Sequence, residues 1–200
     1  MNQTTTLLNN NSAKGIMTGL IMMTLTTLFW TGTAFYGLMN TSYWWLIGIF
    51  PGACIFFIYY AIELFKASKH LPMPSTAEQE DAKKRGKLFG IICAAEGMGI
   101  AVGVNVVRIL HHPELQVPMI ALAVGLHFFP LAKVFKRKMD YYIGLWTTAI
   151  ALLAIFLMLD HEVTKSTMFA FTGIGLALAT TYYGVNMIFV TRRVLARQSI

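Results

Sequence analysis

Glu96 and His127 are ionisable side chains that stand deep inside long apolar runs of this 200-residue chain. In hydrocarbon an ionisable side chain is costly unless it finds a partner, so each of these residues needs an explanation. A carboxylate and an imidazole exchange protons near neutral pH, and both bind cations. The pair therefore indicates either a proton relay or cation contact, or an interhelical hydrogen bond that holds two helices together. Both interpretations fit the residue types.

Other polar residues in apolar runs are expected to add secondary contacts to a solute or proton path; these are Asn105, Tyr182 and Asn186. For the two asparagines, hydrogen bonding between helices is the simpler role. The sequence has no Walker loop and no G-x-S-x-G, H-E-x-x-H or C-x-x-C-H motif. We therefore predict no catalytic residue, no metal site and no cofactor, which favours a protein that is not an enzyme.

The elements that position these residues are six apolar runs. Hydrophobic residues make up 56% of the chain and charged residues 12%. Runs of about 20 apolar residues are long enough to cross the hydrocarbon of a bilayer as helices. The sequence predicts an all-α, polytopic membrane protein with one transmembrane domain over 16–190, between polar tails at 1–15 and 191–200. We place the spans at 16–39, 43–65, 88–110, 115–135, 141–160 and 167–190.

The basic residues orient these spans. Of the 16 Lys and Arg residues, all but Arg108 and Lys165 fall in the tails, in the connections after the second and fourth spans or, for Lys133, at the very end of the fourth span. Because basic residues are retained on the cytoplasmic side, both termini are predicted to be cytoplasmic. The net charge of +7 is then explained by topology and anionic headgroups. No nucleic-acid partner is expected; the bilayer is the partner, and a homo-oligomer is compatible with the chain.

This topology gives Glu96 and His127 matching depths. By helical rise, each lies about 12 Å from the cytoplasmic edge of its span. The third and fourth spans are consecutive and joined by a short connection, so the two side chains are placed where they can meet. A polar cavity between the third, fourth and sixth spans is the expected setting if they line a solute path.

The connection 66–87 is predicted to be a solvated cytoplasmic loop with a short helix. Ser75 and Glu78 have the spacing of a capping box, in which each side chain satisfies a backbone donor at a helix start. Ion pairs at i,i+4 are expected between Glu80 and Lys84 and between Asp81 and Arg85. We expect Gly86 to end this helix before the third span.

Small residues and a short repeat suggest how the spans pack. Ala95, Gly99 and Gly103 recur every four residues, a spacing that lets helices approach closely. The tripeptide Gly-Val-Asn occurs at 103–105 and again at 184–186. In the six-span topology these segments point in opposite directions, as in a three-plus-three inverted repeat of the kind found in transporters.

Residues 125–132, Gly-Leu-His-Phe-Phe-Pro-Leu-Ala, followed by Lys133 and Phe135, resemble a stretch of small uncharacterised bacterial multi-pass membrane proteins. The resemblance covers about a twentieth of the chain. It implies a location in the bacterial cell membrane and brings no substrate or residue role.

Two functions fit these features. The first is a small permease or proton-coupled transporter, in which Glu96 and His127 couple protons to an unknown small solute. The second is a non-transporting membrane protein, such as an assembly, immunity or stress factor, whose polar residues only hold the bundle together.

Overall fold

The structure, a computed structural model, describes residues 9–160 and 163–198. Within these ranges the chain is all-helical, and six helices are long and apolar enough to cross a membrane, which confirms the predicted class. The helices are α1 (Asn10–Leu38), α2 (Ile49–Ser68), α3 (Thr76–Ile109), α4 (Gln116–Phe135), α5 (Lys138–Leu159) and α6 (Lys165–Gln198), with two short 3₁₀ helices, η1 (Trp44–Gly48) and η2 (Pro113–Leu115).

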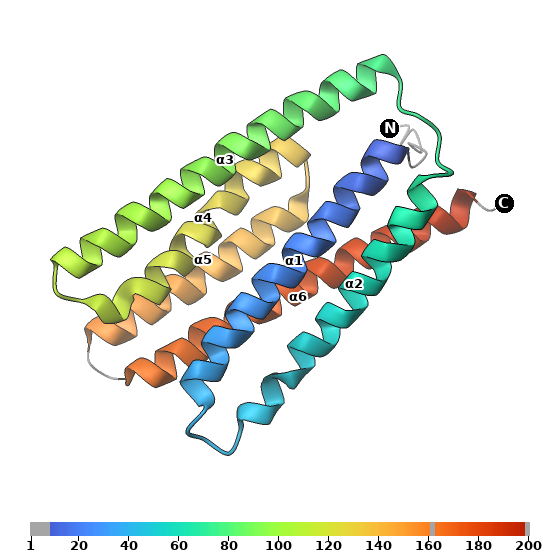
Figure 1. The fold of residues 1–200 in the computed structure, drawn as a ribbon. Coiled ribbons are helices and arrows are strands. Elements are labelled where there is room, and N and C mark those ends of the chain that lie inside the picture. Colours follow the sequence, from blue (N-terminus) through green and yellow to red (C-terminus); the bar gives the residue numbers. More distant parts are fainter. Residues whose placement is uncertain (1–8, 161–162, 199–200) are drawn as a thin grey trace.

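Successive helices run in opposite directions and form two groups (Figure 1). In one group α1 packs against both α2 and α6, and in the other α4 packs against both α3 and α5. Contacts between α5 and α6 join the groups. As Figure 1 shows, the start of α1 and the end of α6 lie at the same end of the bundle as the connection between α2 and α3. The helix α3 is at an edge, with only Gly103 and Val107 fully buried among its residues.

The interface between α1 and α6 is the most extensive in the molecule, and it depends on small residues. Gly37 of α1 lies against the backbone of Ala170, and Gly173 of α6 lies against the backbone of Ala34. A methyl group added at Gly173 would stand 2.8 Å from the carbonyl oxygen of Trp30. In lipid, small residues let backbones approach and gain packing energy where the hydrophobic effect supplies little.

The predicted capping box is confirmed at the start of α3. The backbone nitrogen of Ser75 donates to Glu78 Oε2 at 2.8 Å, and the backbone nitrogen of Glu78 donates to Ser75 Oγ at 3.4 Å. The predicted pair of Asp81 and Arg85 is also formed, with Nη1 and Oδ2 2.8 Å apart. Glu80 and Lys84 do not come within 4 Å as an ion pair in the described part of the chain.

The prediction that Gly86 ends this helix is wrong. The helix α3 continues from Thr76 through Gly86 to Ile109 without interruption. A glycine inside a helix costs about 1 kcal/mol relative to alanine but keeps its backbone donor, so it weakens a helix without breaking it. The solvated start of α3 and the third span are therefore one rigid element.

Two other helices reach beyond the predicted spans. The side chain of Asn9 accepts a hydrogen bond from the backbone of Ser12 and caps α1, which begins at Asn10 inside the predicted N-terminal tail. At the other end, α6 continues to Gln198. The polar segments next to the spans are thus partly helical extensions, because the backbone hydrogen bonds of a helix do not depend on side-chain polarity.

Candidate functional site

Glu96 lies on the side of α3 that faces α4. Gly103 and Val107, seven and eleven residues further along, share this face and are buried. A methyl group added at Gly99 would lie 3.8 Å from Ala123 Cβ, and one at Gly103 would lie 3.0 Å from Met119 Cε. Of the three small residues predicted to let helices approach closely, Gly99 and Gly103 therefore lie against α4, while Ala95 is exposed. The Glu96 side chain is 20% exposed.

His127 meets Glu96 from the middle of α4. The distance between His127 Nδ1 and Glu96 Oε1 is 3.4 Å, and the His127 side chain is 14% exposed. The ring also packs on Phe128, with centroids 4.3 Å apart. The contact with Glu96 is not directed as a hydrogen bond, and Nδ1 has no hydrogen-bond partner among the described residues. The structure thus brings together the two ionisable residues that the sequence placed at one depth.

The contact between Glu96 and His127 has chemical consequences. A carboxyl group and an imidazole at this distance need only a small rotation to share one proton. In apolar surroundings the neutral pair and the ion pair are both accessible, whereas two separate charges are costly. The pair can therefore hold a proton, release it to a neighbour, or simply bind α3 to α4.

The other predicted site residues lie elsewhere. Asn105 is on the exposed side of α3 and donates from Nδ2 to the carbonyl oxygen of Ala101 at 2.7 Å, within its own helix. Tyr182 is 61% exposed on the outside of α6. Asn186 is half-buried on α6. The structure therefore gathers Glu96 with His127 and leaves these three side chains outside that contact.

The packing of the helices also differs from the one expected, which was a polar cavity between the third, fourth and sixth spans. The helix α3 packs on α4 and η2, and in the described residues it makes no substantial contact with α6. Two pockets of about 400 Å³ each lie at the end of the bundle where α1 begins and α6 ends. One of them lies between α2 and α6, where it is lined by Tyr60, Glu63 and Arg192. Neither contains Glu96 or His127.

A second buried ionisable group was missed by the sequence reasoning. Asp140 is 1% exposed in the first turn of α5, and neither carboxylate oxygen has a hydrogen-bond partner among the described residues. Beside it, Arg137 Nη1 donates to Tyr183 Oη at 3.2 Å. Tyr183 packs on Phe128, with ring centroids 6.1 Å apart. The Phe128 ring thus contacts both His127 and Tyr183.

A periodic signal could have revealed Asp140. The buried residues of α5 include Ile143, Thr147, Ala151 and Ala154, which follow a three- and four-residue spacing. Asp140 lies three residues before Ile143, so the same spacing places it on the buried face of α5. The sequence prediction began the fifth span at residue 141 and so left Asp140 in a loop.

An exposed contact of the same chemistry lies at the opposite end of the bundle. His112 Nδ1 and Glu114 Oε1 are 2.8 Å apart, with side chains 44% and 32% exposed. Within the described ranges, no group of three or more His, Cys, Asp or Glu residues is arranged to hold a metal ion. This exposed His–Glu contact provides a natural reference for the one inside the apolar region.

Comparison with protein-family models, with curated protein sequences and with solved structures gives no match to this chain. Its function is therefore inferred from its own residues.

Proposed function

We propose that this protein is a small proton-coupled transporter of the cell membrane, in which Glu96 and His127 form the coupling pair. The observation that carries the proposal is their contact: two titratable side chains from different spans lie 3.4 Å apart and are 20% and 14% exposed. Ionisable residues inside membrane spans are costly, and they commonly mark proton relays or solute paths. The unknown solute is small.

In this proposal a single proton is held between the two side chains. Glu96 carries the proton when the pair is neutral, and His127 Nδ1 takes it to form an ion pair. The helix α3 is held to the bundle through α4, so a shift of α3 along α4 changes the separation of the two groups. Separation favours neutral groups, because an unpaired charge in apolar surroundings is costly. Proton transfer is thereby coupled to helix movement.

A non-transporting membrane factor is the second candidate, and a specific observation favours it. The contact between Glu96 and His127 lies in the interface that attaches α3 to the bundle, and neither of the two pockets described above reaches it. A polar contact between helices contributes about 0.6 kcal/mol on average in a membrane protein. In this case the pair has the purely structural role of holding α3 on α4.

Proton flux in proteoliposomes separates the two functions. Purified protein is reconstituted with an internal pH dye, and a pH gradient is applied with and without a potassium–valinomycin potential. Glu96→Gln and His127→Gln are compared with Glu114→Gln and His112→Gln, which alter the exposed contact of the same residue types. We expect the first two variants to abolish flux at unchanged thermal stability and the second two to retain it. Wild-type protein without flux, together with a lower melting temperature for the first two variants, would support the structural role.

Both termini are placed in the cytoplasm of a bacterial cell in this proposal. The basic clusters support this orientation, and so does the position of the start of α1 and the end of α6 at one end of the bundle. Cysteine labelling tests it in a variant in which Cys54 and Cys93 are replaced by alanine. A membrane-impermeant maleimide should label Tyr43→Cys in intact spheroplasts and Met73→Cys only after lysis; both positions are exposed. The reverse pattern would invert the topology.

The three-plus-three inverted repeat receives less support from the packing. In such a repeat the second and third helices would meet as the fifth and sixth do. The helices α5 and α6 are in contact, whereas α2 and α3 make no substantial contact among the described residues. We therefore base the transport proposal on the Glu96–His127 pair alone and not on repeat symmetry.

A further inference from the structure

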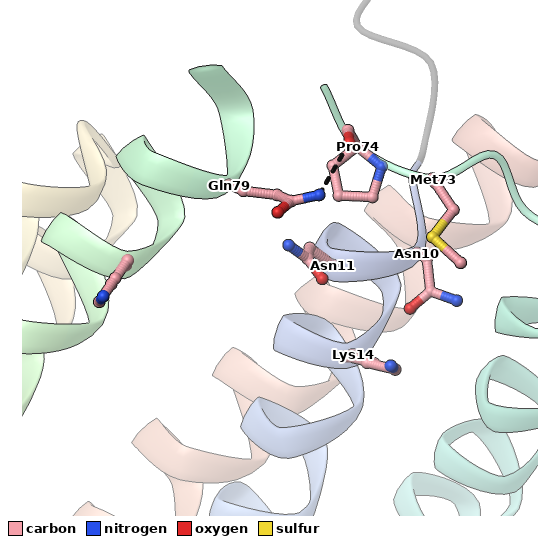
Figure 2. A pocket seen from close by; sticks show the side chains of 7 residues that line it. Asn10, Asn11, Lys14, Met73, Pro74 and Gln79 are labelled. Carbon is pink, nitrogen blue, oxygen red and sulfur yellow. Dashed lines mark hydrogen bonds between the residues drawn. The ribbon is translucent and has the colours of Figure 1, made fainter. Parts of the chain in front are cut away.

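A pocket of about 400 Å³ lies at the end of the bundle that carries the basic clusters (Figure 2). Three parts of the chain form it: the start of α1, the connection between α2 and α3, and the first turns of α3. Its lining residues are Asn10, Asn11, Lys14, Met73, Pro74, Gln79 and Lys83. The pocket therefore spans two helices, α1 and α3, that belong to different packing groups.

The charge of this pocket is positive. Lys14 and Lys83 each contribute an ammonium group, and no Asp or Glu lines the pocket. Among the described residues, neither lysine has a carboxylate within 4 Å: the lysine and arginine ion pairs are Lys66 with Glu63 and Arg85 with Asp81. Glu78, at the start of α3, is already engaged by Ser75. Both lysines are exposed. In Figure 2 Lys14 points away from α3, so its long flexible side chain has to turn for its ammonium group to meet the same anion as Lys83.

The amide side chains around the lysines are held in place. Asn10 Nδ2 donates to the carbonyl oxygen of Ser68 at 2.7 Å, and Gln79 Nε2 donates to that of Pro74 at 3.1 Å. In Figure 2 Asn11 and Gln79 point toward the space between α1 and α3. The second N–H groups of the Asn10 and Gln79 amides, together with the Asn11 amide, can donate to a small oxyanion such as a phosphate, which accepts several hydrogen bonds at once.

The position of the pocket relative to the apolar parts of the helices indicates that the phosphate belongs to a lipid headgroup. Lys14 directly precedes the apolar part of α1, and Lys83 lies one turn before the apolar part of α3. In the orientation proposed above, both are therefore at the depth of the cytoplasmic headgroups. Met73, an apolar residue that lines the pocket, is 87% exposed and suits the boundary between headgroup and acyl chain. Basic pockets between membrane helices on the cytoplasmic side bind anionic phospholipids.

We propose that this pocket binds the phosphate of an anionic phospholipid of the cytoplasmic leaflet, with Lys14 and Lys83 as its two cationic contacts. The bound headgroup bridges α1 and α3 and so holds the two packing groups together at this end. The site is separate from the Glu96–His127 contact and does not depend on transport.

Lipid binding by the purified chain tests this site. The full chain in a mild neutral detergent is titrated with short-chain phosphatidylglycerol, and the melting temperature and the lipid retained in native mass spectrometry are measured. Short-chain phosphatidylcholine and inorganic phosphate serve as the other probes. For the wild type we expect phosphatidylglycerol to raise the melting temperature and to be retained, with little effect of the other two.

The double variant Lys14→Gln/Lys83→Gln should bind phosphatidylglycerol at least about tenfold more weakly, since each lysine near an anionic headgroup contributes about 1 kcal/mol. Lys84→Gln/Lys87→Gln is the matched control, because it removes the same charge from α3 outside the pocket. It should bind as the wild type does. Asn11→Asp, which adds a carboxylate to the pocket and keeps both lysines, should also lose binding.

Three results would overturn the proposal. Equal losses in the pocket variant and in the matched control would reduce the effect to general attraction between a basic surface and anionic lipid. Stabilisation by inorganic phosphate equal to that by phosphatidylglycerol would assign the pocket to a soluble anion. Equal effects of phosphatidylglycerol and phosphatidylcholine on the wild type would remove the charge-selective site altogether.

Discussion

Thr27 of α1 donates a hydrogen bond of 2.8 Å to the hydroxyl of Thr180 on α6, inside the interface between the first and last spans. Both residues are buried. Thr180 in turn donates to the carbonyl oxygen of Leu176 at 3.0 Å. The two hydroxyls thus form a short polar chain that ends on the backbone of α6.

Thr27→Val should lower the free energy of unfolding by about 0.6 kcal/mol, and by no more than about 2 kcal/mol, the range for interhelical hydrogen bonds in membranes. Valine keeps the shape of threonine but cannot donate to Thr180. Thr33→Val is the control: Thr33 is half-buried, and its hydroxyl donates to the carbonyl of Phe29 in its own helix. Thermal unfolding in detergent should separate the two. Equal effects would show that the bond between helices adds nothing.

Gly37→Ala should destabilise the protein by about 1–3 kcal/mol, the usual cost of overpacking. The added methyl group would meet the backbone of Ala170, with Cα at 2.9 Å, and a backbone cannot rotate away. Gly32→Ala, on the same helix, has nothing within 4 Å of the new methyl group and should be neutral or stabilising. The comparison is made by melting temperature. A tolerated Gly37→Ala would contradict the close crossing of α1 and α6.

Tyr183→Phe should destabilise the start of α5, because it removes the acceptor of the 3.2 Å hydrogen bond from Arg137. Hydrogen bonds to charged groups contribute about 1.5–3 kcal/mol, and the partial exposure of this one favours the lower end. The neighbouring Tyr182→Phe is the control, since Tyr182 is 61% exposed. Hydrogen exchange of the backbone amides at 138–142 should increase only in the first variant. Unchanged exchange would assign Tyr183 a packing role.

Gly86→Ala should stabilise α3 by about 0.4–1 kcal/mol. The glycine is in a continuous helix, and a methyl group there meets nothing within 4 Å, so alanine restricts the unfolded chain without a clash. Slower hydrogen exchange over residues 80–90 would show the effect. Faster exchange or a lower melting temperature would instead indicate that the chain bends at Gly86.

The local features of this fold can be predicted from the sequence. Long apolar runs give the six helices because the hydrocarbon core requires each segment to satisfy its own backbone hydrogen bonds. The capping box of Ser75 and Glu78 forms because its two partners are three residues apart and need no tertiary context. Glu96 and His127 lie in contact, as their equal depth on consecutive spans had suggested.

Other features followed from neighbours that are distant in sequence. Asp140 was assigned to a loop, yet it is buried because α5 begins at Lys138 and turns that residue toward Tyr183 of α6. Asn105 and Tyr182 looked like inward-facing polar residues, and the packing of their helices leaves both exposed. Depth along a helix can be read from the sequence, but the direction of a side chain around that helix depends on which helices lie beside it.

The sequence by itself thus predicted six long apolar helices, the grouping of the basic residues and the matching positions of Glu96 and His127 along their helices, since these depend on hydrophobicity and on rise along one helix. Only the tertiary structure decided which helices are neighbours. It placed α1 between α2 and α6, and it left α3 attached through α4, where Glu96 reaches His127. That choice is made by close contacts such as Gly37 with Ala170, whose energies depend on the fit of two surfaces and not on the composition of either.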